Sequence, residues 1–278
     1  MLIIKKLMQG FLFFLLLLSA ASIFADTQFC KPEAVPGGVV ILPITSADHA
    51  QPELFYNKMR VMTLQQNGKW VAIVGVPLSA KVGTDYLTVN SVDSNQKIPF
   101  TIQPKTYPSQ YLTIKNKQMV TLNDANLKRF LSEWEIIHKA MINWRDKDNI
   151  NMHFLMPVQG EITSQFGFKR VLNGEPRSPH QGIDIAAKLG APIVAPANGI
   201  VTLTGNYYLT GKTILIDHGQ GLVTIYCHLN KILVTEGQKV KAGDEIGLVG
   251  KTGRVTGPNL HFGISLNDAE VNPLLFMD

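Results

Sequence analysis

The sequence predicts a mainly β protein with two domains and one connecting helix. Short runs of apolar residues, separated by Gly, Asn, Asp and Ser turns, fill residues 31–105, and a similar pattern fills the chain after residue 153. Between these regions, residues 123–145 have a helical period. A chain of 278 residues is long enough for two compact domains, each with its own core.

Residues 1–25 have the features of an export signal. Lys5 and Lys6 precede the apolar stretch Phe11–Leu18, and small residues lead to a plausible cleavage position after Ala25. We therefore expect an exported protein of the periplasm or cell envelope, with no stable membrane span after cleavage. The apolar stretch is short for a transmembrane helix, and an uncleaved N-terminal anchor is the alternative.

Residues 26–118 are expected to form a β-sandwich domain. Strand-like runs recur there at a regular spacing with turn residues between them, which is typical of a sandwich. The runs are Gly38–Pro43, Lys58–Thr63, Lys69–Val74, Asp85–Val89 and Ile98–Ile102.

Residues 119–150 are expected to form the helix and a linker. Asn123 is a suitable N-cap for a helix over 123–145. One face of this helix is apolar, and we expect it to pack between the two domains. That face consists of Leu127, Phe130, Leu131, Trp134, Ile137, Met141 and Trp144.

In residues 151–278, three side chains are candidate metal ligands: His180, Asp184 and His261. Zn²⁺ binds imidazole nitrogen and carboxylate oxygen, and a catalytic zinc has three protein ligands with one position left to water. Asp184 and His261 each stand between two apolar residues, as polar residues do on one face of a half-buried strand. Neighbouring strands can therefore present these side chains to one cleft.

A fourth candidate, His228, ends the strand-like run Leu222–His228. Strict alternation puts it on the same face as Thr224 and Tyr226. A single histidine is more often a hydrogen-bonded core residue than a ligand, but four such groups together are a stronger signal. The other histidines are expected to lie outside the site; they are His49, His138, His153 and His218.

Residues 154–277 resemble the lysostaphin/LytM-type zinc endopeptidases, peptidase family M23, which cut peptide cross-links in bacterial cell walls. The resemblance implies a LytM-type antiparallel β-sheet peptidase domain with Zn²⁺ on His180, Asp184 and His261, a catalytic role for His228, and peptidoglycan peptides as substrate. An immunoglobulin-like module precedes this domain in some exported members, so the sandwich is expected to be of that type. The motifs that carry the resemblance are Ser164–Arg170, His180–Ala187, Ala195–Val201, Ile216–Gly219, Tyr226–Leu229, Val240–Gly247 and Thr252–His261.

At Asn259 the sequence departs from this family, which has a second catalytic histidine two residues before the last metal ligand. An amide donates and accepts hydrogen bonds but takes up no proton near neutral pH. Loss of a general base costs on the order of 10²–10⁴ in rate. The sequence thus predicts a weakened zinc endopeptidase in which Asn259 positions water or substrate. The alternative is a non-catalytic wall-binding protein or an activator of a cell-wall amidase.

Two loops are expected to rim the substrate groove. They are Val171–Pro179 and Gly205–Gly211, the second with Tyr207 and Tyr208. Because the sandwich and the helix directly precede the peptidase-like region, we also expect them to act as a cover or as a docking module for the cell wall.

Composition limits the classes of partner. The net charge is +5, and no stripe of Lys and Arg with interleaved aromatic residues is present, so no nucleic-acid partner is expected. The mild positive charge slightly favours approach to an anionic wall or membrane surface. Cys30 and Cys227 are expected to be free thiols, with a disulfide between them as the alternative.

Overall fold

The computed structural model describes residues 29–45, 50–89 and 96–277, so the predicted signal segment and His49 lie outside the described residues. Within these ranges the fold is mainly β with a single α-helix, which confirms the predicted fold class. No helix in the described part of the chain is long and apolar enough to cross a membrane.

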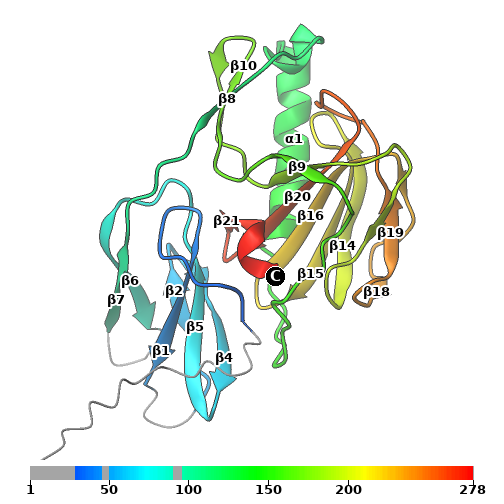
Figure 1. Ribbon diagram of the computed structural model, residues 1–278. Helices are drawn as coiled ribbons and strands as arrows, with labels where there is room; N and C mark the ends of the chain where they lie inside the picture. The colour runs from blue at the N-terminus through cyan, green and yellow to red at the C-terminus, as the bar shows by residue number, and fades with distance from the viewer. Residues whose placement is uncertain (1–28, 46–49, 90–95, 278) are drawn as a thin grey trace, which may run out of the picture.

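The N-terminal region is a β-sandwich of two antiparallel sheets (Figure 1). Apolar side chains from both sheets, among them Val74 and Leu87, are buried between them. One sheet has the order β1 (Val39–Ile44), β5 (Lys69–Gly75), β4 (Met62–Gln66), and the other β3 (Met59–Arg60), β2 (Leu54–Tyr56), β6 (Gly83–Val89), β7 (Lys97–Ile102). The predicted run Lys58–Thr63 is therefore divided between two strands, β3 and β4, which belong to different sheets.

The C-terminal region is built on a long, largely antiparallel sheet of eight strands. Its order is β18 (Lys239–Val240), β14 (Gly199–Tyr207), β15 (Gly211–Gly219), β16 (Leu222–Leu229), β20 (Asn259–Leu266), β12 (Ile183–Ala186) and β9 (Glu161–Ser164), with β21 (Ala269–Val271) also pairing with β20. A small sheet beside it consists of β13 (Pro192–Val194), β19 (Glu245–Leu248) and β17 (Lys231–Ile232). The chain ends in a short 3-10 helix, η2 (Pro273–Phe276).

Another small sheet connects the segment that follows the sandwich to the C-terminal region. Strand β8 (Ser109–Leu112) pairs in parallel with β10 (Lys169–Leu172), which pairs in turn with β11 (Glu175–Pro176). The 3-10 helix η1 (Lys117–Met119) follows β8 and leads into α1.

Helix α1 spans Asp124–Met141, so it ends before the predicted residue 145. Asn123 is the N-cap as predicted, because its Oδ1 accepts the Asn126 N–H at 2.9 Å. The expectation that the apolar face packs between the domains was wrong for the helix itself, although Trp144, beyond its end, lies under the Arg60 guanidinium of the sandwich at 4.5 Å. In the C-terminal half, Ile137 and Met141 are buried against β14, β15 and β16, while Leu131 near the N-terminal half is 54% exposed.

The sandwich and the C-terminal sheet share one hydrophobic core rather than touching through a polar interface. The outer face of β4 and β5 belongs to the same buried cluster as the ends of β16, β20 and β21. Backbones also approach closely, since a Cβ on Gly75 would lie 2.5 Å from the Leu266 carbonyl oxygen. The sandwich residues in this cluster include Met62, Leu64, Val71 and Ile73, and the C-terminal residues include Leu222, Leu266 and Val271.

Two buried side-chain amides, each in a hairpin turn of the C-terminal sheet, hydrogen-bond to the backbone of the sandwich; they are here called the amide pins. Asn267 accepts the Gly75 N–H at 2.7 Å and donates to the Gly75 carbonyl at 3.0 Å. Gln220 accepts the Thr63 N–H at 3.0 Å and donates to the Lys147 carbonyl at 2.7 Å. Buried backbone groups need such partners, so these contacts fix the register of the two regions.

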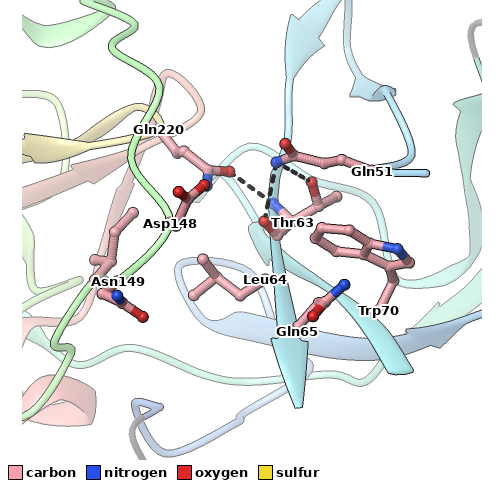
Figure 2. A pocket seen from close by; sticks show the side chains of 9 residues that line it. Gln51, Thr63, Leu64, Gln65, Trp70, Asp148, Asn149 and Gln220 are labelled. Carbon is pink, nitrogen blue, oxygen red and sulfur yellow. Dashed lines mark hydrogen bonds between the residues drawn. The ribbon is translucent and has the colours of Figure 1, made fainter. Parts of the chain in front are cut away.

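Figure 2 shows the second of these contacts beside a cavity of about 300 Å³. Gln51 donates to the Thr63 carbonyl and hydroxyl oxygens at 3.3 and 3.1 Å, opposite Gln220. Thr63 lies in β4, an edge strand of its sheet, so side-chain amides satisfy backbone groups that would otherwise be free to pair with another strand.

Candidate metal centre and groove

Adjacent strands bring the three predicted ligands together. Asp184 on β12 lies directly opposite His261 on β20, and His180 precedes β12 by a short turn. His261 Nδ1 lies 2.9 Å from Asp184 Oδ1 and 2.9 Å from His180 Nε2, and His180 Nε2 lies 3.1 Å from Asp184 Oδ1. Two nitrogens and one oxygen thus form a nearly equilateral triangle.

The size of this triangle suits a zinc ion. Its sides of about 3 Å bring the three donor atoms close enough for a single ion to contact all of them at about 2.0–2.1 Å, the usual zinc–ligand distance. His180, Asp184 and His261 are also the cluster of metal-binding side chains found among the described residues. The donor set and its spacing therefore fit the ion that the sequence predicts.

The protonation state of His180 also suits a ligand. Its Nδ1 donates to the Gln165 carbonyl at 3.0 Å and lies 3.0 Å from Ser164 Oγ, which leaves the Nε2 lone pair for a metal. Burial lowers the pKa of His180 to about 4. The imidazole is therefore neutral at pH 7, as metal ligation requires.

Asp184 is held as a carboxylate by its neighbours. Burial by itself would raise its pKa, but hydrogen bonds with His180 and His261 outweigh burial and hold the pKa of Asp184 well below its usual range. Arg170 on β10 donates to Asp184 Oδ2 at 2.5 Å. This leaves Oδ1 facing the two histidines. This role of Arg170 was not predicted, because Asp184 lies on another strand and only the motif Ser164–Arg170 pointed to the residue.

His228 reaches the same place by an irregularity in β16. Cys227 and His228 together oppose Thr213 on β15, which is a β-bulge, and His228 has a left-handed backbone with φ of 68°. Such a conformation costs a non-glycine residue about 1–3 kcal/mol. The bulge turns the His228 ring toward His261, with ring centroids 6.2 Å apart.

The predicted face of His228 was therefore wrong. Thr224 and Tyr226 point into the core, where their hydroxyl oxygens lie 2.9 Å apart, while His228 lines the groove beside the metal-binding cluster. His228 Nδ1 donates to the Thr252 carbonyl at 2.8 Å, which leaves Nε2 as the nitrogen available to a ligand. Burial, followed by the nearby His261, lowers the pKa of His228 to about 4.

Asn259 lies opposite Ala186, one strand repeat from His261 and on the same face of β20. Its Oδ1 is buried and has no hydrogen-bond partner among the described residues. Nearby, a Cβ on Gly182 would lie 2.8 Å from the His261 ring, so only glycine leaves room for that ring. The sequence analysis did not identify this role of Gly182.

A cavity of about 500 Å³, here called the groove, opens over His180, His228 and His261. Both predicted rim loops contribute to it, and Tyr207 lines it, whereas Tyr208 is not one of its lining residues. The far wall comes from α1 and the segment before it. The lining includes His180, His228 and His261 on one side and Val120, Phe130, Glu133 and Trp134 on the other.

Residues 117–134, here called the cover segment, are tied to both rims of the groove. On one rim, Glu133 Oε2 accepts the Tyr208 N–H at 2.6 Å, and the Tyr208 hydroxyl donates to the Gln118 carbonyl at 3.3 Å. On the other rim, Arg177 donates to the Val120 carbonyl at 2.9 Å. The cover segment therefore bridges the groove directly above the metal-binding cluster.

Of the remaining histidines, those among the described residues, His138, His153 and His218, lie outside the metal-binding cluster, as predicted. His218 is buried, with Nδ1 3.0 Å from the Asn198 carbonyl and Nε2 2.8 Å from Thr224 Oγ1. His138 lies 2.8 Å from Asp268. Cys30 and Cys227 are both buried and free, which confirms the prediction of two thiols.

Comparison with known proteins gives this arrangement a family. Residues 178–273 match the model of peptidase family M23, and residues 32–105 match the model of the M23 N-terminal domain. Peptidoglycan DD-endopeptidase ShyA of Vibrio cholerae is 37% identical over 152 residues, which are 55% of this chain and 31% of the relative. DD-carboxypeptidase/endopeptidase Mpg of Neisseria meningitidis is 38% identical over 130 residues, 47% of this chain and 30% of the relative.

The chain thus spans about a third of the length of these curated relatives. A solved structure matches far more of it: a peptidase M23 from Pseudomonas aeruginosa is 36% identical with a TM-score of 0.73, over 88% of this chain and 95% of that one. The agreement covers both the sandwich and the C-terminal sheet. On these matches, together with the M23 models, the protein belongs to peptidase family M23.

Proposed function

We propose that this protein is an exported zinc endopeptidase that hydrolyses peptide bonds in the stem peptides or cross-links of peptidoglycan. The observation that carries the proposal is the triangle of His180, Asp184 and His261 on the floor of a groove, with His228 beside it. The names of the relatives, a peptidoglycan DD-endopeptidase and a DD-carboxypeptidase/endopeptidase, support this substrate class. Such a substrate also agrees with export to the periplasm or cell envelope.

When bound, zinc would supply Lewis-acid activation of a water molecule and of the scissile carbonyl. His180 and His261 would offer ring nitrogens to it, and Arg170 holds Asp184 so that one carboxylate oxygen remains available. His228 presents Nε2 to the groove without a proton, because Nδ1 donates to the Thr252 carbonyl. Nε2 can therefore accept a proton from water and, once protonated, donate a hydrogen bond to the developing oxyanion or pass the proton on. Asn259 is left to position water or substrate through its unpartnered Oδ1.

Incubation of the purified protein with muropeptides, with zinc and after chelation, tests this function. We expect new amines and smaller peptides with zinc, and none after the chelator removes it. Chromatography with mass spectrometry would identify the bond that is cut. Binding to cell walls without any turnover would instead favour the amidase activator or wall-binding protein, the reading that Asn259 supports.

We further propose that the cover segment restricts entry of substrate to the groove. Glu133→Ala removes the acceptor of the Tyr208 N–H, and should therefore loosen the segment and raise turnover of cross-linked muropeptides several-fold. Glu135→Ala is a matched control on an exposed position of the same helix. Hydrogen exchange over residues 117–134 should rise in the Glu133 variant alone. Faster exchange without faster turnover would show that the segment is no barrier.

A further inference from the structure

Three guanidinium groups line the groove beside the metal-binding cluster, and two of them have an acidic partner. Arg170 pairs with Asp184, and Arg177 pairs with Glu175. Arg254 is different. Its Nη1 donates to the Met119 carbonyl at 3.3 Å, and among the residues that the structure describes no carboxylate lies within ion-pair distance of it.

The positive charge of Arg254 is therefore not compensated by a carboxylate of the described residues. A guanidinium remains protonated in any folded protein, and charges withdrawn from water are normally paired. Burial, followed by the charges of Arg170 and Arg177 on the same groove lining, lowers the pKa of Arg254. The acid that lines the groove, Glu133, already accepts hydrogen bonds from Arg129 and the Tyr208 N–H.

The backbone of Arg254 is held rigidly, as a ligand-binding residue requires. Its N–H donates to the Leu209 carbonyl at 2.8 Å in the turn between β14 and β15. The preceding residue, Gly253, has φ of 74°, and a Cβ there would lie 2.4 Å from the same carbonyl. This close packing fixes the loop that leads into β20, which carries Asn259 and His261.

We infer that Arg254 is a specificity-determining residue that binds a free carboxylate of the substrate peptide close to the scissile bond. The inference rests on the proposed function. A planar guanidinium binds a carboxylate through two parallel hydrogen bonds, and the ligand supplies the missing negative charge. The carboxylate can belong to the peptide C-terminus or to an acidic side chain, since both have the same chemistry.

Three synthetic cross-linked stem peptides test the inference on the full zinc-loaded protein: one with free carboxylates, one amidated at the C-terminus and one amidated at the side-chain carboxylate. We expect one of the two amidations to raise KM by roughly 10-fold or more, with a smaller change in kcat. That amidation identifies the carboxylate that Arg254 binds. Equal KM values for all three peptides would overturn the inference.

The Arg254→Gln variant provides the second arm. It should raise KM for the peptide with free carboxylates by roughly 10-fold or more. KM for the amidated peptide that the wild type binds more weakly should stay unchanged, so that the preference for the carboxylate disappears. Arg254→Lys should restore part of the preference, because it keeps the charge but loses the bidentate geometry. A KM that rises equally for every peptide would mean that Arg254 has only a structural role.

A binding measurement separates this inference from the proposed function. Calorimetry with an uncleavable acylated dipeptide and its carboxamide should show tighter binding of the carboxylate to the wild type and no preference in Arg254→Gln. Absence of turnover on all peptides, with this preference intact, would contradict the endopeptidase and leave the carboxylate site standing. Turnover without any preference for the carboxylate would support the endopeptidase and contradict the carboxylate site.

Discussion

Replacing Asp184 with alanine should leave the protein almost without zinc and without turnover. The change removes the one oxygen of the triangle and leaves the Arg170 guanidinium without its partner beside the site. Groups that merely orient a ligand contribute about 10–100-fold to metal affinity, so loss of the ligand itself should cost more than roughly 100-fold. His180→Ala and His261→Ala should behave alike.

Metal analysis of purified variants, with folding checked by circular dichroism, measures this effect. His218→Ala is the matched control, because His218 is another buried histidine but its ring nitrogens contact the Asn198 carbonyl and Thr224. It should retain one zinc per chain. Full zinc occupancy in Asp184→Ala would mean that the metal, if present, binds elsewhere.

Replacing Asn259 with histidine should raise turnover of cross-linked muropeptides by on the order of 10²-fold or more. Asn259 lies on the same face of β20 as His261, so an imidazole there would stand next to the metal-binding cluster and could accept a proton. The gain should appear in kcat more than in KM, because binding of the substrate does not depend on the new base. Steady-state kinetics on one muropeptide measures both.

The double variant Asn259→His, His261→Ala tests the cause of that gain. A base is of little use once the metal that activates the water is lost, so the gain should vanish. Wild-type turnover equal to that of Asn259→His would show that asparagine costs nothing, with His228 as the base. Inactivity of both proteins, with wall binding intact, would favour the activator.

The parts of the site that follow strand alternation could be predicted from the sequence. Asp184 and His261 stand on the expected faces because β12 and β20 pair without a register shift through both residues. The pairing of β12 with β9 on its other edge is irregular after Asp184, but this does not change the face of Asp184 relative to His261. His228 broke the rule, since the bulge opposite Thr213 inserts one residue and reverses the face of the side chain. No pattern in the local sequence predicted that bulge.

Contacts between distant segments were the other limit. The helical period predicted α1 and its N-cap. It could not predict which part of the molecule packs against the apolar face of the helix, and part of that face lines the groove. The partners of Arg170 and Arg254 are likewise far away in the chain. Such pairings arise from tertiary packing, so they cannot be predicted from the composition of the chain or from the spacing of its residues.

The amide pins at Asn267 and Gln220 determine which part of this molecule is able to move. A rotation of the sandwich away from the C-terminal sheet would leave the backbone groups of Gly75 and Thr63 without hydrogen-bond partners, each at a free-energy cost of about 1–3 kcal/mol. It would also expose the shared hydrophobic core to water. Hinge motion between the two regions is therefore disfavoured. The cover segment is held to the groove rims mainly by single hydrogen bonds at part-buried or exposed positions, and its Leu131 is already exposed to solvent. Access to the groove should accordingly be controlled by local unfolding of one helical turn after another.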